Sequence, residues 1–167
     1  MASILSEAKS LVERGTKELL IISQDTSAYG LDLKFEETLV NRKKLKTNIY
    51  NLVNELASLG IWVRLHYIYP YPHVKQLIPL MDQNRVLPYL DVPFQHAHPD
   101  VLKRMARPSN NVHDLEQISE WRSMNPDLSI RSTFIVGFPG ETESEFNFLL
   151  DWLEAVSYTH LTLPTSG

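Results

Sequence analysis

Polar side chains follow each of four apolar runs in the sequence, at the positions where α/β folds place their functional groups. They include carboxylates, amides, imidazoles and a guanidinium, together with a glycine-rich turn. In chain order the groups are Gln24, Asp25 and Thr26, then His66, Tyr67 and Tyr69, then Asp91, Gln95 and His96, and finally Arg131, Thr133, Gly137, Gly140 and Glu141. Polar residues that follow buried strands line ligand sites more often than polar residues spread along helices. The spacing therefore predicts one binding rim built from four strand ends.

Each of these residues also has a purely structural interpretation. Asp25 is of a type that caps turns through its carboxylate, and His66 could fill the mouth of a barrel. His73 and His98 adjoin prolines and suit surface turns, whereas His96 fits a ligand role and a structural role equally. The pattern alone leaves both interpretations open.

The turn at 137–142, Gly-Phe-Pro-Gly-Glu-Thr, allows close backbone approach and precedes a helix start with free amide donors. It lacks the Lys-Ser/Thr ending of a phosphate-binding loop and the spacing of a dinucleotide fingerprint. A flat ligand lying over a glycine-bearing strand end fits it better. The sequence also contains no histidine pair with zinc-protease spacing and no Gly-x-Ser-x-Gly elbow of a serine hydrolase.

The elements that position these groups alternate between helix and strand. Strands are expected over 18–23, 61–69, 85–92 and 129–136, each followed by one of the polar groups. Helices are expected over 3–14, from a Thr47 cap to Gly60, around 74–81, from Pro99, around 115–121, and from a Thr142 and Glu145 capping box. This order predicts an α/β fold with a parallel sheet of about four strands and five helices joined by right-handed crossovers. An open doubly wound sheet and part of a (β/α) barrel both satisfy it.

Three local expectations follow from residue patterns. The continuous apolar run at 18–23 suits a strand covered on both faces. The last helix should bury Phe146, Leu149, Leu150 and Leu153. The basic run at 42–46 is expected to be a solvated loop.

Composition narrows the class of protein. The 167 residues are 43% apolar and 22% charged, which is typical of a globular domain, and no apolar run approaches the ~20 residues of a membrane span. The N-terminal residues show no secretory signal pattern, so a cytoplasmic location is expected. A net charge of −4 makes nucleic acid an unlikely direct partner. The absence of cysteine excludes disulfides, thiolate catalysis and cysteine-held clusters for these residues.

Four segments in combination resemble the radical-SAM methylthiotransferase family over about residues 3 to 155. They are Ile22-Ser23-Gln24-Asp25-Thr26-Ser27-Ala28-Tyr29-Gly30, the run 64–73 (RLHYIYPYPH), the run 88–97 (PYLDVPFQHA) and the run 131–142 (RSTFIVGFPGET). The first three resemble the branch that modifies an aspartate of a ribosomal protein (RimO type) more than the tRNA-modifying branch. The resemblance implies a partial (β/α) TIM-type barrel.

The resemblance also implies an activity, cofactors and a partner. Members add a methylthio group to the β-carbon of an aspartate in a small-subunit ribosomal protein, using S-adenosylmethionine and two [4Fe–4S] clusters. By position, Gln24 and Asp25 would face the methionine moiety, and Gln95 and His96 would face the ribose side. Arg131 would face the carboxylate. The adenine would lie against Ile135, Gly137, Phe138, Pro139 and Gly140.

The sequence departs from the family pattern in lacking the CxxxCxxC loop before the first helix and the three cysteines of the second cluster. We therefore expect residues 1–156 to be a partial radical-SAM half-barrel that is inactive by itself, followed by an atypical tail at 157–167. The later barrel strands and the C-terminal substrate-binding domain are expected to be missing as well. Three alternatives remain: a tRNA-modifying fragment, a non-catalytic S-adenosylmethionine-binding module, and another barrel enzyme using His66, Asp91 and His96.

Overall fold

The computed structural model describes residues 1–82, 86–107 and 111–158 of the chain. These residues form two compact units, which are described one at a time. Unit 1 comprises Met1–Pro93 and Trp121–Ser132, and unit 2 comprises Phe94–Glu120 and the chain from Thr133 onward.

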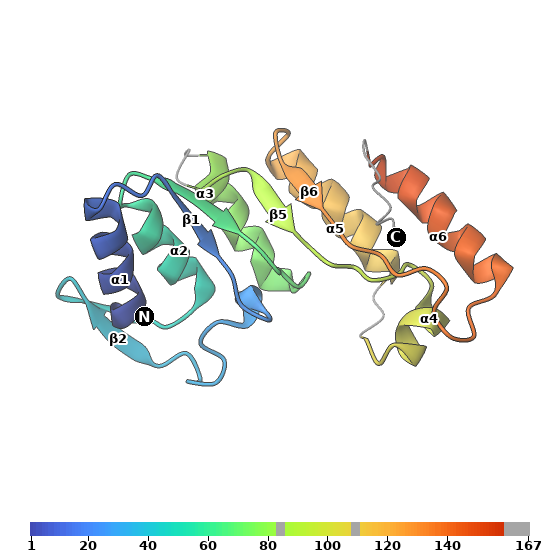
Figure 1. The fold of residues 1–167 in the computed structure, drawn as a ribbon, viewed down its shortest axis with the longest axis horizontal. Helices are drawn as coiled ribbons and strands as arrows, with labels where there is room; N and C mark the ends of the chain where they lie inside the picture. The colour runs from blue at the N-terminus through green and yellow to red at the C-terminus, as the bar shows by residue number, and fades with distance from the viewer. Residues whose placement is uncertain (83–85, 108–110, 159–167) are drawn as a thin grey trace. The chain divides into compact units, whose positions relative to one another are not determined.

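Unit 1 is built on a parallel sheet (Figure 1). Its strands are β1 (Glu18–Ile21), β4 (Trp62–Leu65), β5 (Tyr89–Asp91) and β6 (Ser129–Arg131), in the spatial order β1-β4-β5-β6. Each neighbouring pair is parallel. The predicted α/β class and four-stranded parallel sheet are confirmed.

Helices pack on unit 1 as the apolar periodicity predicts. The helices are α1 (Ala2–Glu13), α2 (Ile49–Ala57) and α3 (Ile78–Asp82), the last preceded by a 3-10 turn at Pro72–Leu77. Gly15 follows α1 and ends it, because its φ of 96° allows the N–H groups of Gly15 and Thr16 to reach the carbonyls of Val12 and Leu11. The chain thereby turns back toward the start of β1.

The sheet is covered on one face only. Leu19, Val63, Leu65 and Leu90 are buried, whereas Leu20 is 51% exposed on the opposite face. The expectation that the 18–23 run is covered on both faces is therefore wrong within the described residues. Its apolar residues are continuous, but the period-two alternation of a strand still sends every second side chain to the other face.

The strands are shorter than the sequence predicts. β4 ends at Leu65 rather than at Tyr69, and the left-handed φ of 53° at Tyr67 interrupts the extended backbone. β6 ends at Arg131 instead of continuing to Val136. The expected start of the third strand, Arg85, lies outside the described residues.

The cap of α2 is Asn48 and not Thr47. The Asn48 side-chain oxygen accepts a hydrogen bond from the Asn51 N–H at 2.8 Å. Thr47 is fully buried, and its hydroxyl lies 2.9 Å from that of Thr38. Both residue types can cap a helix. Because the Thr47 side chain is buried beside Thr38, Asn48 provides the cap.

The basic run forms a hairpin instead of a loop. Strand β2 (Glu37–Val40) pairs antiparallel with β3 (Lys43–Lys46), and the two connecting residues, Asn41 and Arg42, have φ angles of 48° and 66°. Two consecutive positive φ values are typical of the tight turn that matches strand twist. Asn41 was the sequence indication of this turn.

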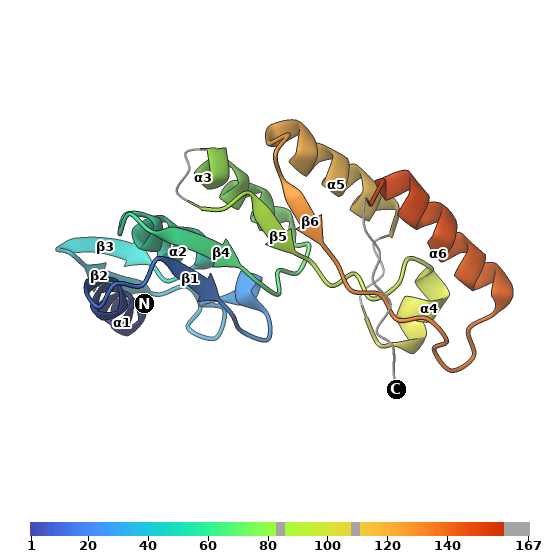
Figure 2. The ribbon, with the colours of Figure 1, turned by 45° about the horizontal axis from the view of Figure 1, so that its top comes forward.

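Unit 2 contains α4 (Pro99–Arg104), most of α5 (Asn111–Met124) and α6 (Glu143–Val156) (Figure 2). The predicted Pro99 start is confirmed, and so is the Thr142 and Glu145 capping box. An isolated parallel bridge joins Gln95 to Phe134.

The buried face of α6 differs from the predicted one. Phe146 and Leu150 are 36% and 41% exposed. Leu149 is buried as predicted, and the helix also buries Glu145, Trp152 and Val156. Trp152 packs edge-on against the rings of Phe94 and Phe134, at centroid distances of 5.4 and 5.6 Å, so an aromatic cluster selects the face.

The expected tail is described only at its start. Ser157 ends α6 with a left-handed φ of 58°, and residues 159–167 lie outside the described residues. Among the helices of the described ranges, none has the length and apolar character required to cross a bilayer.

Candidate functional site

Three charged or polar side chains form a row across the uncovered face of the sheet in unit 1. The register pairs Leu65 with Leu90 and Asp91 with Arg131, so the residue after Leu65, His66, lines up with both. His66 Nδ1 lies 3.3 Å from Asp91 Oδ2, and Arg131 Nη1 lies 3.7 Å from the same oxygen. The Asp91 side chain is 4% exposed, whereas that of Arg131 is 61% exposed. A buried carboxylate thus holds an imidazole and an accessible guanidinium side by side.

A second set of contacts lies two residues earlier along the strands, on the same face of the sheet. Arg64 Nε donates to Glu18 Oε1 at 2.6 Å, and its guanidinium lies 5.0 Å from the centroid of the Tyr89 ring. Burial raises the pKa of Tyr89, and the Asp91 carboxylate raises it further. A hydrogen bond with Tyr89 and the charge of Asp91 raise the pKa of Arg131. Arg131 is therefore a permanent cation at the end of this network.

The loop after β1 is tied down by Asp25. This carboxylate caps the 3-10 turn Thr26–Ala28, accepting from the Ala28 N–H at 3.2 Å and from the Ser27 hydroxyl at 2.5 Å. It also accepts the Tyr71 hydroxyl at 3.0 Å. Burial and the bond to Asp25 raise the pKa of Tyr71. The structural interpretation of Asp25 as a cap is confirmed, while the neighbouring Gln24 is exposed.

The loop after β4 is bonded to the same segment. The Thr26 N–H donates to the Tyr67 carbonyl at 3.0 Å, and the Tyr69 N–H donates to the Ser27 hydroxyl at 3.0 Å. His73 Nε2 donates to the Ser27 carbonyl at 2.9 Å. The loops after β1 and β4 are thus bonded to each other, and the rim of four strand ends stays a prediction.

A cavity adjoins this rim that the sequence analysis missed. Its volume is about 310 Å³, and its lining includes the rings of Tyr29, Phe35, Tyr50 and His73 together with Lys46. Tyr29 and Phe35 come from the loop and Tyr50 from the first turn of α2, so no local sequence pattern marks them as neighbours.

In unit 2, His96 is enclosed by its own partners. The residue is 1% exposed. Its Nδ1 accepts the His98 N–H at 2.9 Å, which places the ring proton on Nε2, and Nε2 lies 3.3 Å from Glu141 Oε1. Both ring nitrogens are therefore used within unit 2.

Glu141 links His96 to the glycine-rich turn. Its Oε2 accepts the Phe138 N–H at 3.0 Å, and its own N–H donates to the Phe138 carbonyl at 2.8 Å. Pro139 and Gly140, the latter with a φ of 82°, occupy the central positions of this four-residue turn, as type II geometry requires. The turn is exposed at Gly137, Pro139 and Gly140.

Gln95 joins the strand before this turn by backbone bonds. Its N–H donates to the Thr133 carbonyl at 3.0 Å, and its carbonyl accepts the Ile135 N–H at 2.8 Å. Gln95 itself has a φ of 69°, and the Ile135 side chain is 42% exposed. The structure therefore brings the predicted ribose-side and adenine-side residues together within unit 2.

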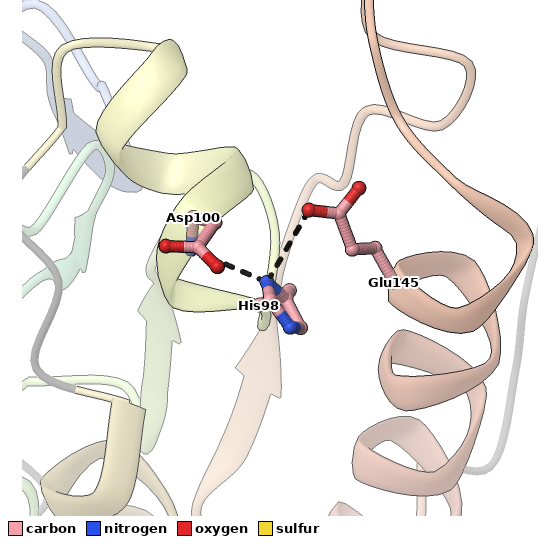
Figure 3. Close-up of side chains that lie close together, drawn as sticks. All are labelled: His98, Asp100 and Glu145. Carbon is pink, nitrogen blue, oxygen red and sulfur yellow. Dashed lines mark hydrogen bonds and ion pairs between the residues drawn. The ribbon is translucent and has the colours of Figure 1, made fainter.

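A further polar cluster in unit 2 surrounds Glu145 (Figure 3). Arg104 donates to its Oε2 at 2.8 Å and the Thr142 N–H donates to the same atom at 2.8 Å. These bonds, that of Arg104 first, lower the Glu145 pKa to about 2. His98 Nδ1 lies 3.7 Å from Glu145 Oε1 and accepts the Asp100 N–H. The group of His98, Asp100 and Glu145 has the residue types of a metal site, but the Arg104 cation already pairs with Glu145.

Five residues of these networks were not singled out from the sequence for binding or catalysis: Glu18, Arg64, Tyr89, Arg104 and Glu145. The first three alternate with buried residues on their strands, which is the pattern that could have placed them on the open face. Nothing local indicates that Arg104 and Glu145 meet, because 41 residues separate them.

Residues 1–153 match the radical SAM superfamily. The chain belongs to this superfamily. Its α/β architecture and the polar strand ends of its parallel sheet are thereby those of a partial radical SAM barrel, whose four strands form an open sheet in unit 1. Enzymes of the radical SAM superfamily use S-adenosylmethionine and [4Fe–4S] clusters.

The similar proteins are ribosomal protein uS12 methylthiotransferases. The protein of that name from Herminiimonas arsenicoxydans is 56% identical over 165 residues, 96% of this chain and 36% of the relative. That from Rhodopseudomonas palustris is 58% identical over 160 residues, covering 96% and 36%. That from Roseobacter denitrificans is 60% identical over 152 residues, covering 91% and 32%. The chain spans about a third of the length of these relatives.

Proposed function

We propose that this chain is the cofactor-binding part of a radical SAM transferase that methylthiolates an aspartate of the small-subunit ribosomal protein uS12. The observation that carries the proposal is the 56–60% identity to uS12 methylthiotransferases over more than nine-tenths of the chain. The open sheet face supports it, because its charged row offers polar groups at the strand ends where barrel enzymes bind ligands.

We assign the cofactor contacts to the residues that the family resemblance indicates. Arg131 offers an accessible guanidinium for a carboxylate, and Gln24 and Asp25 would contact the methionine moiety. Gln95 and His96 would lie on the ribose side, with His96 acting through the bonds that position Glu141 rather than by direct contact. The adenine would lie against the exposed segment formed by Ile135, Gly137, Phe138, Pro139 and Gly140.

The glycine segment is open where a planar ring would lie. A Cβ added at Gly137 meets no atom within 4 Å apart from its chain neighbours, so the space on that side of the glycine is open. Bound S-adenosylmethionine supplies the adenosyl radical and the methyl group of this class of reaction. The chain contributes binding and orientation.

The clusters do not fit the residues present. The 167 residues contain no cysteine, and thiolates are the ligands of such clusters. We therefore assign no step to this chain that passes through a cluster, and we propose that the chain by itself is inactive. We further propose a cytoplasmic location, the uS12 protein as partner, and no direct contact of this segment with nucleic acid or membrane.

Direct binding tests the cofactor assignment. Calorimetric titration of the chain with S-adenosylmethionine and with 5′-methylthioadenosine should show saturable binding of both, because both carry the adenosine. Gly137→Ala should weaken this binding. Gly15→Ala is the matched control, since Gly15 also has a positive φ and no atom within 4 Å of an added Cβ. Equal losses in the two variants, or no binding of either ligand, would contradict the assignment.

A chimera tests the transferase assignment. Residues 1–153 would replace the matching third of the Herminiimonas arsenicoxydans protein, which supplies the remainder of the enzyme. Mass spectrometry of uS12 should then show the methylthio group on one aspartate. A well-folded chimera that binds S-adenosylmethionine but leaves uS12 unmodified would refute the substrate assignment.

A further inference from the structure

His66 holds an unsatisfied polar atom beside an accessible cation. Its Nε2 is buried and has no hydrogen-bond partner among the described residues, while its Nδ1 faces Asp91 at 3.3 Å. An ionised carboxylate cannot donate, so Nδ1 carries a proton in that contact. A buried imidazole nitrogen without a partner is costly, and the cost is removed when a ligand completes its bonding.

The charges of the row indicate what kind of ligand this is. With a neutral imidazole, Asp91 and Arg131 cancel and the row has no net charge. With an imidazolium, the row carries one positive charge: Asp91 Oδ2 lies 3.3 Å from Nδ1 of His66 and 3.7 Å from Nη1 of Arg131, and Nε2–H becomes a second donor on the His66 ring. A ligand ammonium would meet the Arg131 cation, whereas a ligand carboxylate would meet two donors and restore neutrality.

We propose that His66, Asp91 and Arg131 form a carboxylate-binding site in which binding is coupled to protonation of His66. The proton comes from solvent and resides on Nε2, and Asp91 stabilises the resulting imidazolium. The chemistry is shared by two sources within the proposed function on which this inference rests, the α-carboxylate of the cofactor and the side chain of the target aspartate. His66 is then a binding residue, which is one of the two interpretations that the sequence pattern left open.

The surroundings of His66 are compatible with this coupling. The rings of Tyr67 and Tyr89 lie 6.3 and 5.5 Å from its ring, and neither adds a formal charge while protonated. The other charged pair on this face, Glu18 with Arg64, is neutral as a pair. Tyr67 is 45% exposed, so it and Arg131 can reorient to admit a ligand.

Nuclear magnetic resonance of the histidine rings in the full chain tests the proposal. The probes are N-acetyl-L-aspartate amide for the target side chain and L-methionine for the cofactor, with N-acetyl-L-asparagine amide as the control without a carboxylate. One carboxylate probe should shift the His66 resonances and move their titration to higher pH. Its dissociation constant should rise about tenfold per pH unit above the His66 midpoint, because one proton is taken up. The asparagine probe should do neither.

Variants locate the effect. Arg131→Gln and Asp91→Asn should each abolish the probe-dependent shift, whereas His73→Gln, a rim histidine outside the row, should leave it unchanged. Unchanged His66 resonances in the wild-type chain at high probe concentration, or an affinity independent of pH, would overturn the proposal without any variant. The effective probe identifies the source of the carboxylate.

The outcome is separable from that of the proposed function. 5′-Methylthioadenosine carries no carboxylate, so its binding reports the adenosine site alone. Binding of 5′-methylthioadenosine without any His66 response would refute the carboxylate site and leave the cofactor assignment standing. A His66 response without 5′-methylthioadenosine binding would do the opposite.

Discussion

His66 in unit 1 and His96 in unit 2 follow apolar strand segments in the same way, yet their surroundings differ. His96 is 1% exposed and both of its ring nitrogens have partners in unit 2. His66 has one partner, Asp91, and one buried nitrogen without any among the described residues. A saturated histidine holds a turn in place, and an unsaturated one is available to a ligand. This difference distinguishes a histidine that supports the fold, His96, from one with a ring nitrogen available to a ligand, His66, although both follow apolar strand segments.

The largest expected effect is on the saturated histidine. His96→Ala should cost roughly 2–4 kcal/mol of stability, because it removes a buried side chain and leaves Glu141 short of a partner. His66→Ala should cost about 1 kcal/mol, since Asp91 retains Arg131. Denaturant unfolding measures both, and hydrogen exchange of the Ile135 amide should show the His96 loss in unit 2. Equal costs for the two variants would break the comparison.

The stability that the cluster around Glu145 gives to unit 2 should depend on pH. The pKa of Glu145 is lowered from 4.5 to about 2, so its ion pair with Arg104 stabilises the folded chain above pH 4.5. That contribution is lost as the pH falls from 4.5 toward 2. Thermal unfolding measured from about pH 6 to about pH 2 should therefore show a smaller fall in melting temperature for Glu145→Gln than for the unsubstituted chain. A parallel decline in both proteins would contradict the assignment.

Helix caps provide a matched pair across the units. Asn48→Ala in unit 1 and Thr142→Ala in unit 2 should each cost about 1 kcal/mol, because each removes an acceptor for a first-turn N–H. Hydrogen exchange should place each loss in its own helix, α2 or α6. Similar costs would sharpen the comparison by showing that the units differ in their polar clusters and not in ordinary helix stability.

The smallest stability effect is expected at the open end of the row. Arg131→Gln should change the free energy of unfolding by less than about 0.5 kcal/mol, because its side chain is 61% exposed and lies 3.7 Å from Asp91. Chemical unfolding measures this change, and His96→Ala serves as the reference for removing a side chain whose two ring nitrogens both have partners. A loss near 2 kcal/mol would place Arg131 in the scaffold.

Much of the site was predictable because strand ends concentrate polar residues. The rim around Asp25, the turn at 137–142 and the position of Arg131 followed from motifs in the sequence. The partners did not, because the Arg104 contact with Glu145 and the Tyr71 contact with Asp25 join residues more than 40 positions apart. The cap at Asn48 instead of Thr47 shows the same limit at short range.

The sequence alone determined the order of helices and strands apart from the β2–β3 hairpin, the parallel sheet and the family resemblance, because apolar periodicity and local motifs record them directly. Only the tertiary structure decided which sheet face is open, and which of two similar histidines is saturated. The physical reason is that burial and hydrogen-bond completion depend on side chains brought together from distant segments. His66 and His96 are the same residue type, and their neighbours leave one with a buried nitrogen that has no partner among the described residues and give the other a partner at both ring nitrogens.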